Sequence, residues 1–196
     1  MLNIFQYKII FLFLAGLLLG GCFGSPSSVP EDRFYTFKVT KADKNKTKFR
    51  RIAIKKVHAY GLYNERALLY SHADKPLQIK RYHYHHWVVP PTQLVQQSLK
   101  DYLGQSNIAD DVVVQAISPN DALRVSAELL AFERVIKQAE QFVRVEIEFE
   151  VRNSNRKYKT YKYSEIIKTS KNTLHSTAEA YGKALGKIYQ KFVMAL

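Results

Sequence analysis

Three histidines stand close together between Tyr82 and Trp87, and imidazole side chains are common metal ligands. In an extended strand alternate residues share a face, so His83 and His85 would lie on one side about 7 Å apart, with His86 on the other. A zinc site needs three or four ligands, and the nearest acid along the chain is Asp74. We therefore expect no metal site and no cofactor, and assign these histidines to the surface or to aromatic packing.

Catalytic motifs are also missing from the sequence. It contains no Gly-x-Ser-x-Gly elbow, no glycine-rich phosphate loop and no His-Glu-x-x-His pair. The carboxylates of Glu146, Glu148 and Glu150 alternate with apolar residues within 142–151, which is typical of the solvated face of a strand. We expect the protein not to be an enzyme, and an envelope hydrolase is the weakest alternative.

Cys22 is the residue with the clearest predicted chemistry, because it is the single cysteine and follows an apolar stretch at 9–19. Eleven helical residues span roughly 16 Å, too short for a hydrocarbon core of about 30 Å. Leu19-Gly20-Gly21-Cys22 resembles the lipobox of bacterial lipoproteins, in which the thiol accepts a diacylglycerol. We predict an export signal at 1–21 and lipid attachment at Cys22. The alternative is an ordinary signal peptide that ends near a cysteine.

Phe23 bears on the destination of the exported chain. An Asp at this position would resemble the inner-membrane retention signal of enterobacterial lipoproteins, and the sequence has none there. We expect a protein anchored in the inner leaflet of the outer membrane and facing the periplasm.

Charge indicates what kind of partner the protein attracts. The formal net charge is +13, and +12 once Lys8 leaves with the signal, which favours polyanions. Export excludes nucleic acid and leaves membrane headgroups and proteins. The lysine- and tyrosine-rich segment 156–163 could stack on single-stranded RNA. We interpret it instead as an exposed strand whose lysines discourage edge-to-edge pairing.

The mature chain is expected to begin with a flexible tether at 22–33, rich in serine and proline, followed by one domain at 34–196. Turn residues and apolar alternation predict its strands. They are expected at 33–39, 51–60, 67–71, 77–89, 111–117, 123–134, 142–151 and the lysine–tyrosine segment, with turns at 61–66, 118–121 and 153–155.

Two helices are expected. The first begins at Pro90 and Pro91 and ends near Gly104. The second begins around 172–176, with Ser176 and Glu179 as a capping box. This order predicts an α+β domain: one twisted, mostly antiparallel sheet with two amphipathic helices packed on one face.

Short motifs in order along the chain resemble the ABC-type transport auxiliary lipoproteins, the family that includes paraquat-inducible protein C. The similarity runs through an aromatic strand, a strand that ends in a tyrosine turn, a tryptophan before prolines and a strand ending in phenylalanine–glutamate. These motifs are Phe34-Tyr35-Thr36-Phe37, Arg51-Ile52-Ala53-Ile54, Ala59-Tyr60, His86-Trp87-Val88-Val89-Pro90-Pro91 and Leu129-Leu130-Ala131-Phe132-Glu133. His58, Val88 and Val89 depart from the family pattern, so a partner surface there would differ.

The resemblance implies a non-catalytic component of an ABC- or MCE-type system that moves phospholipids between the two membranes. Its implied partners are the MCE-domain and ABC-transporter components and, through the acyl anchor, outer-membrane lipid. Tyr60 and Trp87 are the candidate contact residues, and the alternative for both is packing in the core. A structural or assembly lipoprotein that helps an outer-membrane or secretion complex is the second functional hypothesis. Homo-oligomer formation is left open.

Overall fold

The computed structural model describes residues 30–114, 122–153 and 157–196. The expected signal at 1–21 and Cys22 lie outside the described residues, as do the turn expected at 118–121, the end of the strand expected at 111–117 and most of the turn at 153–155. The chain forms two units, Met1–Glu31 and Asp32–Leu196, and the second holds every element described below.

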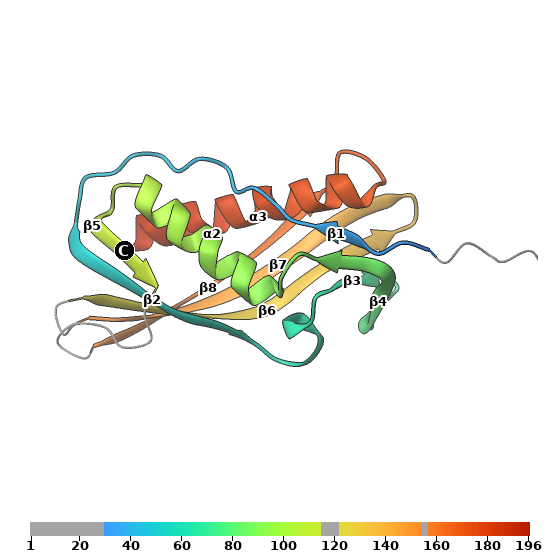
Figure 1. Cartoon of the computed structure of the whole chain (residues 1–196), viewed down its shortest axis with the longest axis horizontal. Coiled ribbons are helices and arrows are strands. Elements are labelled where there is room, and N and C mark those ends of the chain that lie inside the picture. Colours follow the sequence, from blue (N-terminus) through green and yellow to red (C-terminus); the bar gives the residue numbers. More distant parts are fainter. Residues whose placement is uncertain (1–29, 115–121, 154–156) are drawn as a thin grey trace, which may run out of the picture. The chain divides into compact units, whose positions relative to one another are not determined.

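The described residues form eight strands, two α-helices and one 3-10 helix (Figure 1). In chain order they are β1 (Arg33–Tyr35), β2 (Phe49–Ala59), η2 (Gly61–Asn64), β3 (Ala67–His72), β4 (Lys75–Trp87), α2 (Pro91–Gln105), β5 (Ala109–Val114), β6 (Leu123–Lys137), β7 (Glu140–Arg152), β8 (Tyr158–Lys168) and α3 (Leu174–Ala195).

Strand β6 is the centre of the sheet. One of its edges pairs with β7 along almost its whole length, and β7 pairs in turn with β8, both antiparallel. The other edge is shared, because β2 pairs with residues 123–129 and β3 with residues 134–136, both parallel to β6. The strands β2 and β3 are therefore two halves of one interrupted neighbour, with η2 at the interruption. Beyond them, β5 pairs with β2, β4 with β3, and β1 with β4.

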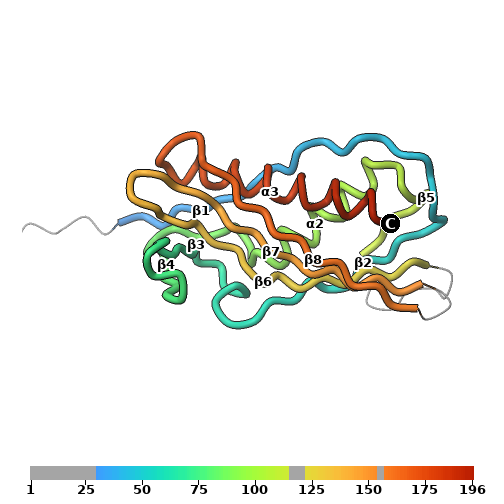
Figure 2. Tube along the Cα trace, turned by 180° about the vertical axis from the view of Figure 1, so that it is seen from behind, coloured from blue at the N-terminus to red at the C-terminus, as the bar shows by residue number. Residues whose placement is uncertain are grey.

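The two described helices lie on one face of this sheet, as both views show (Figures 1 and 2). Helix α2 covers β2 and β5, α3 covers β7 and β8, and the helices also contact each other. The predicted α+β domain, with a mostly antiparallel sheet and both helices on one side, is confirmed. The turn expected at 61–66 is occupied by η2 and a bend, after which β3 continues along the same edge of β6 in the direction of β2.

Strand β7 shows why the sheet has a dry and a wet face. Val143, Val145, Ile147 and Phe149 are fully buried beneath the helices, whereas the intervening Arg and Glu side chains are partly or fully exposed. The alternation expected over 142–151 therefore sets which face the helices cover.

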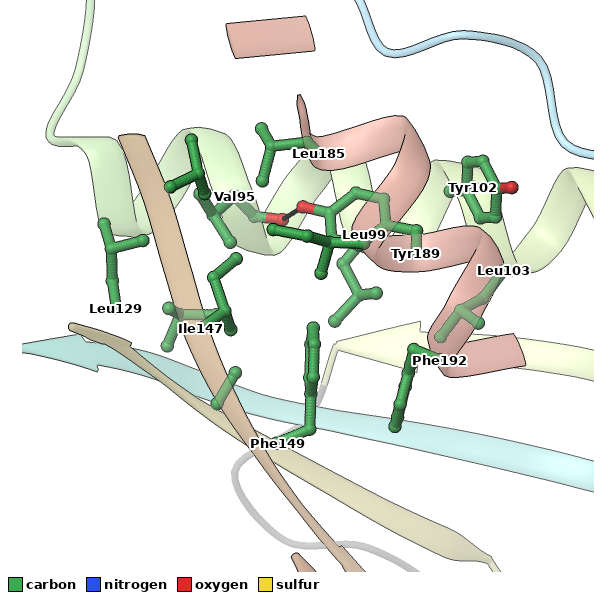
Figure 3. Close-up of a cluster of buried hydrophobic side chains, with 14 of the residues drawn as sticks. Val95, Leu99, Tyr102, Leu103, Leu129, Ile147, Phe149, Leu185, Tyr189 and Phe192 are labelled. Carbon is green, nitrogen blue, oxygen red and sulfur yellow. Dashed lines mark hydrogen bonds between the residues drawn. The ribbon is translucent and has the colours of Figure 1, made fainter. Parts of the chain in front are cut away.

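The core lies between this face and the helices (Figure 3). Its central side chains are Val95, Leu99, Leu103, Leu129, Ile147, Phe149, Leu185, Tyr189 and Phe192, all 0 or 1% exposed. The Phe149 and Phe192 rings stack 4.2 Å apart and join β7 to α3. Each buried aliphatic or aromatic side chain contributes about 1.5–3 kcal/mol, so this layer is the main source of stability.

Residues 36–48 form a strap that crosses the helices from β1 to β2. The Lys38 carbonyl lies against Gly182 of α3, where an added Cβ would be 2.0 Å from that oxygen. One turn later a Cβ on Gly186 would be 2.7 Å from Thr40 Oγ1. At its far end the strap is fixed by the hydrogen bond that Asn45 N donates to Ser106 O, at 2.8 Å. The two glycines therefore allow the strap to lie directly on the helix.

The strand expected at 33–39 ends early, at Tyr35. Its partner β4 ends at Trp87, which is paired with Tyr35. Pro90 and Pro91 then begin α2 and have no N–H to extend a ladder. Residues after Tyr35 have no strand to pair with and become the strap.

Helix α3 begins at Leu174, within the range expected for it, but its expected capping box is wrong, and α2 ends one residue beyond Gly104. The cap of α3 is Thr173, whose Oγ1 accepts a hydrogen bond from Ser176 N at 3.2 Å, so Ser176 is the third helical residue and no capping box forms with Glu179. Gly104 lies within the last turn of α2, and the left-handed residue beyond the helix is Asn107, with φ 57°. Asparagine tolerates this conformation, which is why a glycine is not required there.

Gly182→Ala is expected to lower the free energy of unfolding by about 1–2 kcal/mol, because the new Cβ would displace the strap backbone. In urea titrations Gly186→Ala should cost less, since the Thr40 side chain can rotate away. Gly104→Ala is the matched control, because nothing lies within 4 Å of its added Cβ, and it should gain up to about 1 kcal/mol of helix propensity. Equal effects at Gly182 and Gly104 would contradict the close contact.

Tyr189 predicts how stability responds to alkaline pH. Its hydroxyl donates to Val95 O at 3.1 Å and lies 2.9 Å from Ser98 Oγ, and burial raises the pKa of Tyr189 above its ordinary value of 10.0. Above pH 10 the unfolded chain therefore loses a proton that the native protein retains, so the free energy of unfolding falls as pH rises. Tyr189→Phe should cost about 1 kcal/mol at neutral pH and make this alkaline decline shallower. If denaturation at several pH values shows the same alkaline decline in the free energy of unfolding for Tyr189→Phe and wild type, the prediction is wrong.

Candidate partner-binding site beside Tyr60

The structure separates the two candidate contact residues. Trp87 is 1% exposed, and its ring lies 5.2 Å from Tyr181, 5.5 Å from Phe132 and 5.8 Å from Phe37. Of the two alternatives for Trp87, packing in the core is the one observed, because no free surface remains for a partner. Tyr60 is 79% exposed and is available for contact.

The backbone at the end of β2 positions Tyr60. Tyr60 directly precedes η2 and still has extended dihedral angles, whereas Gly61 has φ +57°, a left-handed conformation that suits glycine. The chain therefore turns sharply out of the sheet directly after Tyr60. The tyrosine turn that follows Ala59 in the sequence is this break between β2 and β3.

A buried carboxylate fixes η2 to the sheet. Glu133 of β6 is 1% exposed and accepts hydrogen bonds from the Tyr63 hydroxyl at Oε2 and from Ser71 Oγ at Oε1, 3.4 Å away. Arg144 Nη2 lies 2.9 Å from the same Oε1. Burial raises the pKa of Tyr63, and the hydrogen bond and charge of Glu133 raise it further, so the hydroxyl stays protonated and donates. A rigid support of this kind holds Tyr60 at the break.

A shallow hollow of about 310 Å³ lies beside Tyr60 on the sheet face opposite the helices. It is lined by His58, Tyr60, Ser126, Ala127, Glu128, Glu148 and Glu150. Glu128 and Glu148 are directly opposite each other in the ladder between β6 and β7. Like charges in this arrangement repel and destabilise the sheet. We call this surface the acidic hollow.

Lys162, beside the acidic hollow, does not fully neutralise it. Lys162 of β8 is paired in register with Glu148, but its Nζ lies 2.8 Å from Glu146, which does not line the hollow. The hollow therefore concentrates negative charge on a protein whose net charge is +13. A concave site of one sign attracts oppositely charged groups, so its geometry suits a basic segment of a protein.

The histidine cluster does not keep the regular alternation expected for it. Between the pairs Leu69↔Arg81 and Ala67↔His86, β4 has three more residues than β3, and Tyr84 has φ 59°. His85 Nδ1 lies 3.0 Å from the Tyr35 hydroxyl, and His86 Nε2 lies 3.3 Å from Asp32. The pKa of His85 is lowered by burial and then by the charges of Arg33 and His86.

The described part of the chain has neither a cluster of metal ligands nor a membrane-spanning helix. Within it, no three His, Cys, Asp or Glu side chains come together as a metal site. No helix in residues 30–114, 122–153 and 157–196 is long and apolar enough to cross a membrane.

The lysine–tyrosine segment forms β8, which among the described strands pairs only with β7. Tyr161 and Tyr163 turn toward the helices, where their rings lie 5.9 Å from Phe192 and 6.2 Å from Phe149. Lys159 and Lys162 are exposed. This is the expected exposed edge strand, with Tyr161 and Tyr163 used for packing.

Sequence reasoning did not find the acidic hollow or the role of Glu133. The alternation in β7 placed Glu148 and Glu150 on the wet face, but their opposition to Glu128 depends on register. Register across β6 and β7 cannot be taken from one strand alone. Glu133 belongs to the phenylalanine–glutamate motif, but its hydrogen bond with Tyr63 joins residues 70 positions apart in the sequence. The motif alone does not predict that contact.

Comparisons with known proteins agree with the fold. The chain resembles a solved structure of a Xanthomonas campestris protein from the DUF330 family, with a TM-score of 0.71 and 15% identity over 82% of this chain and 92% of that one. A second solved structure, of an uncharacterized protein, has a TM-score of 0.63 and 12% identity over 85% of this chain and 96% of that one. Comparison with curated proteins gives no match. At these identities the solved structures show the fold alone.

The match to a family model shows more than a shared fold. The family model described as "ABC-type transport auxiliary lipoprotein component" matches residues 35–193, from the last residue of β1 to the final turn of α3. That range includes the strap, the break at Tyr60 and both helices. The chain therefore belongs to the family of ABC-type transport auxiliary lipoprotein components.

Proposed function

We propose that this protein is the non-catalytic, lipid-anchored component of an ABC- and MCE-type system that moves phospholipids between the two membranes of the envelope. The observation that carries the proposal is the family match over residues 35–193, directly after a sequence that resembles a lipobox and ends at Cys22. The acyl anchor at Cys22 holds the domain on the inner leaflet of the outer membrane, facing the periplasm.

We further propose that Tyr60 and the acidic hollow bind a basic segment of an MCE-domain or ABC-transporter component. Three features support this assignment: Tyr60 is exposed, the hollow beside it is concave and acidic, and Glu133 holds the break in place. Exposed tyrosines that combine an apolar ring with a polar end are frequent at protein interfaces. Trp87 contributes indirectly, as part of the core beneath.

The anchor can be tested by separating lipidation from folding. Cys22→Ala should abolish incorporation of labelled palmitate. A second form, in which residues 1–22 are replaced by an ordinary cleavable signal, should keep the native circular dichroism spectrum, because the core lies within 35–196. It should fail to complement a strain that lacks the gene, since the tether raises the local concentration near partners into roughly the millimolar range.

Two outcomes would separate the parts of this proposal. Palmitate labelling that persists in Cys22→Ala would remove the assignment of the lipid to that residue. Full complementation by the soluble form at native abundance would leave the attachment site in place and show that the anchor is dispensable.

Tyr60→Ala is expected to weaken binding of the partner component at least tenfold, because aromatic residues at the centre of an interface commonly contribute about 2 kcal/mol or more. Binding of the purified partners can be measured by biolayer interferometry. Tyr158→Ala is the matched control: it removes a tyrosine that is 56% exposed, but on β8. Both variants should unfold within about 0.5 kcal/mol of wild type.

The charge of the acidic hollow provides a second arm of the same experiment. Glu128→Gln with Glu148→Gln should weaken binding and reduce its dependence on salt, since fewer charges then face the basic segment. If Tyr60→Ala and Tyr158→Ala weaken binding equally, the contact does not lie at the hollow.

A further inference from the structure

Exposed apolar side chains gather at the end of the domain where the chain emerges from the expected tether. Leu77 is 99% exposed, Phe34 is 54% and Tyr84 is 44%. Phe34 belongs to β1, and the other two belong to β4, the strand beside it (Figure 1). Single exposed apolar residues are ordinary on protein surfaces, but these three lie on adjacent strands.

Irregular pairing makes β4 protrude. Between the pairs His72↔Lys75 and Tyr70↔Lys80, β4 has three more residues than β3, so Pro76 to Ile79 bulge away from the ladder. Leu77 lies in this bulge. Tyr84 lies in the second bulge and has φ 59°, a conformation that bulky residues rarely adopt. Strained positions of this kind are retained where the surrounding structure or the function requires them.

Positive charge predominates along β4, and Asp74, directly before it, is the nearest acid in the sequence. The thirteen residues of β4 include three cations and three histidines but no carboxylate. Lys75 and Lys80 flank Leu77 and are exposed, and Arg81 is paired with Glu65 at 2.7 Å. We call the exposed side chains of Phe34, Lys75, Leu77, Lys80 and Tyr84 the β4 rim. Apolar and aromatic groups among cations are what an anionic lipid surface binds at its interface.

The length of the tether places the β4 rim near a membrane. This step rests on the proposed lipid anchor at Cys22. Eleven residues lead from Cys22 to Arg33, the first residue of β1. A chain of eleven residues spans at most about 40 Å, even when fully extended. The β1 end of the domain, with the β4 rim beside it, is therefore the end held within reach of the headgroups, whereas the C-terminal end of α3 lies at the opposite end of the domain (Figure 1).

We propose that the β4 rim docks the anchored domain on the membrane, with Leu77 and Tyr84 in the interfacial layer and Lys75 and Lys80 at anionic headgroups. The lipid anchor attaches the domain to the membrane, and the β4 rim orients it. Docked in this way, the domain keeps its β1 and β4 end on the lipid and extends α3 toward the periplasm.

The test uses the lipidated protein reconstituted in vesicles of phosphatidylethanolamine with or without phosphatidylglycerol. Because the native chain has a single cysteine and that thiol is acylated, Leu77→Cys provides the only free thiol for a bimane label. Met194→Cys is the matched control, since Met194 is 67% exposed near the end of α3. A lipid-borne nitroxide should quench the label at 77 several-fold more than the label at 194, and iodide in the buffer should show the reverse order.

Charge variants test the cause of docking. In the labelled Leu77→Cys protein, Lys75→Glu with Lys80→Glu should reduce the lipid-borne quenching at least twofold. Lys55→Glu with Lys56→Glu makes the same change of charge on β2, where both lysines are also exposed, and should leave the quenching unchanged. Omitting phosphatidylglycerol should reproduce the effect of the first pair.

The remaining outcomes overturn the proposal in distinguishable ways. Protein that floats with the vesicles but is quenched equally at 77 and 194 shows an anchor without docking. A label at 77 that is shielded from both iodide and the nitroxide shows that a second copy covers the β4 rim. Protein that does not float at all removes the anchor of the proposed function, and this inference with it.

Discussion

The Glu133 carboxylate is buried in the middle of the sheet, and a buried charge destabilises a protein unless it is paired and fully hydrogen-bonded. Tyr63, Ser71 and Arg144 meet this requirement, and they come from η2, β3 and β7. Tyr63 reaches the carboxylate because η2 lies between β2 and β3. The contacts of Glu133 therefore hold the interruption beside β6 in place, and with it the position of Tyr60.

A second constraint acts on the other side of the sheet. The strap must cross α3 to connect β1 with β2, and Gly182 is where the two backbones meet most closely. Phe37 of the strap contacts Trp87, and Trp87 contacts Tyr181 of α3. The segment that follows the tether is thus part of the aromatic core. A load on the proposed anchor would be transmitted to β1, the strap and α3 together.

Regular patterns in the sequence predicted the regular parts of this fold. The alternation from Val143 to Val151 gave the buried face of β7, and apolar residues at helical spacing gave α2 and α3, because burial of one face decides both. Irregular parts depend on contacts between distant residues. The parallel pairing of β2 and of β3 with β6, the bulges of β4 and the Thr173 cap each follow from partners that a linear pattern does not reveal.

The candidate site divides in the same way. A sequence motif is enough to name Tyr60, whereas the opposition of Glu128 and Glu148 depends on the register between β6 and β7.

The irregular parts are also where the two proposed binding surfaces lie, and their charges are opposite. The acidic hollow lies on β2, β6 and β7 beside Tyr60, next to the break between β2 and β3, and the β4 rim arises from bulges in the next strand pair. A basic protein segment is attracted by the first and repelled by the second, while anionic headgroups show the reverse preference. Each partner is therefore directed to its own surface by the sign of its charge. A single small domain can in this way contact a membrane and a protein at once without the two competing for one site.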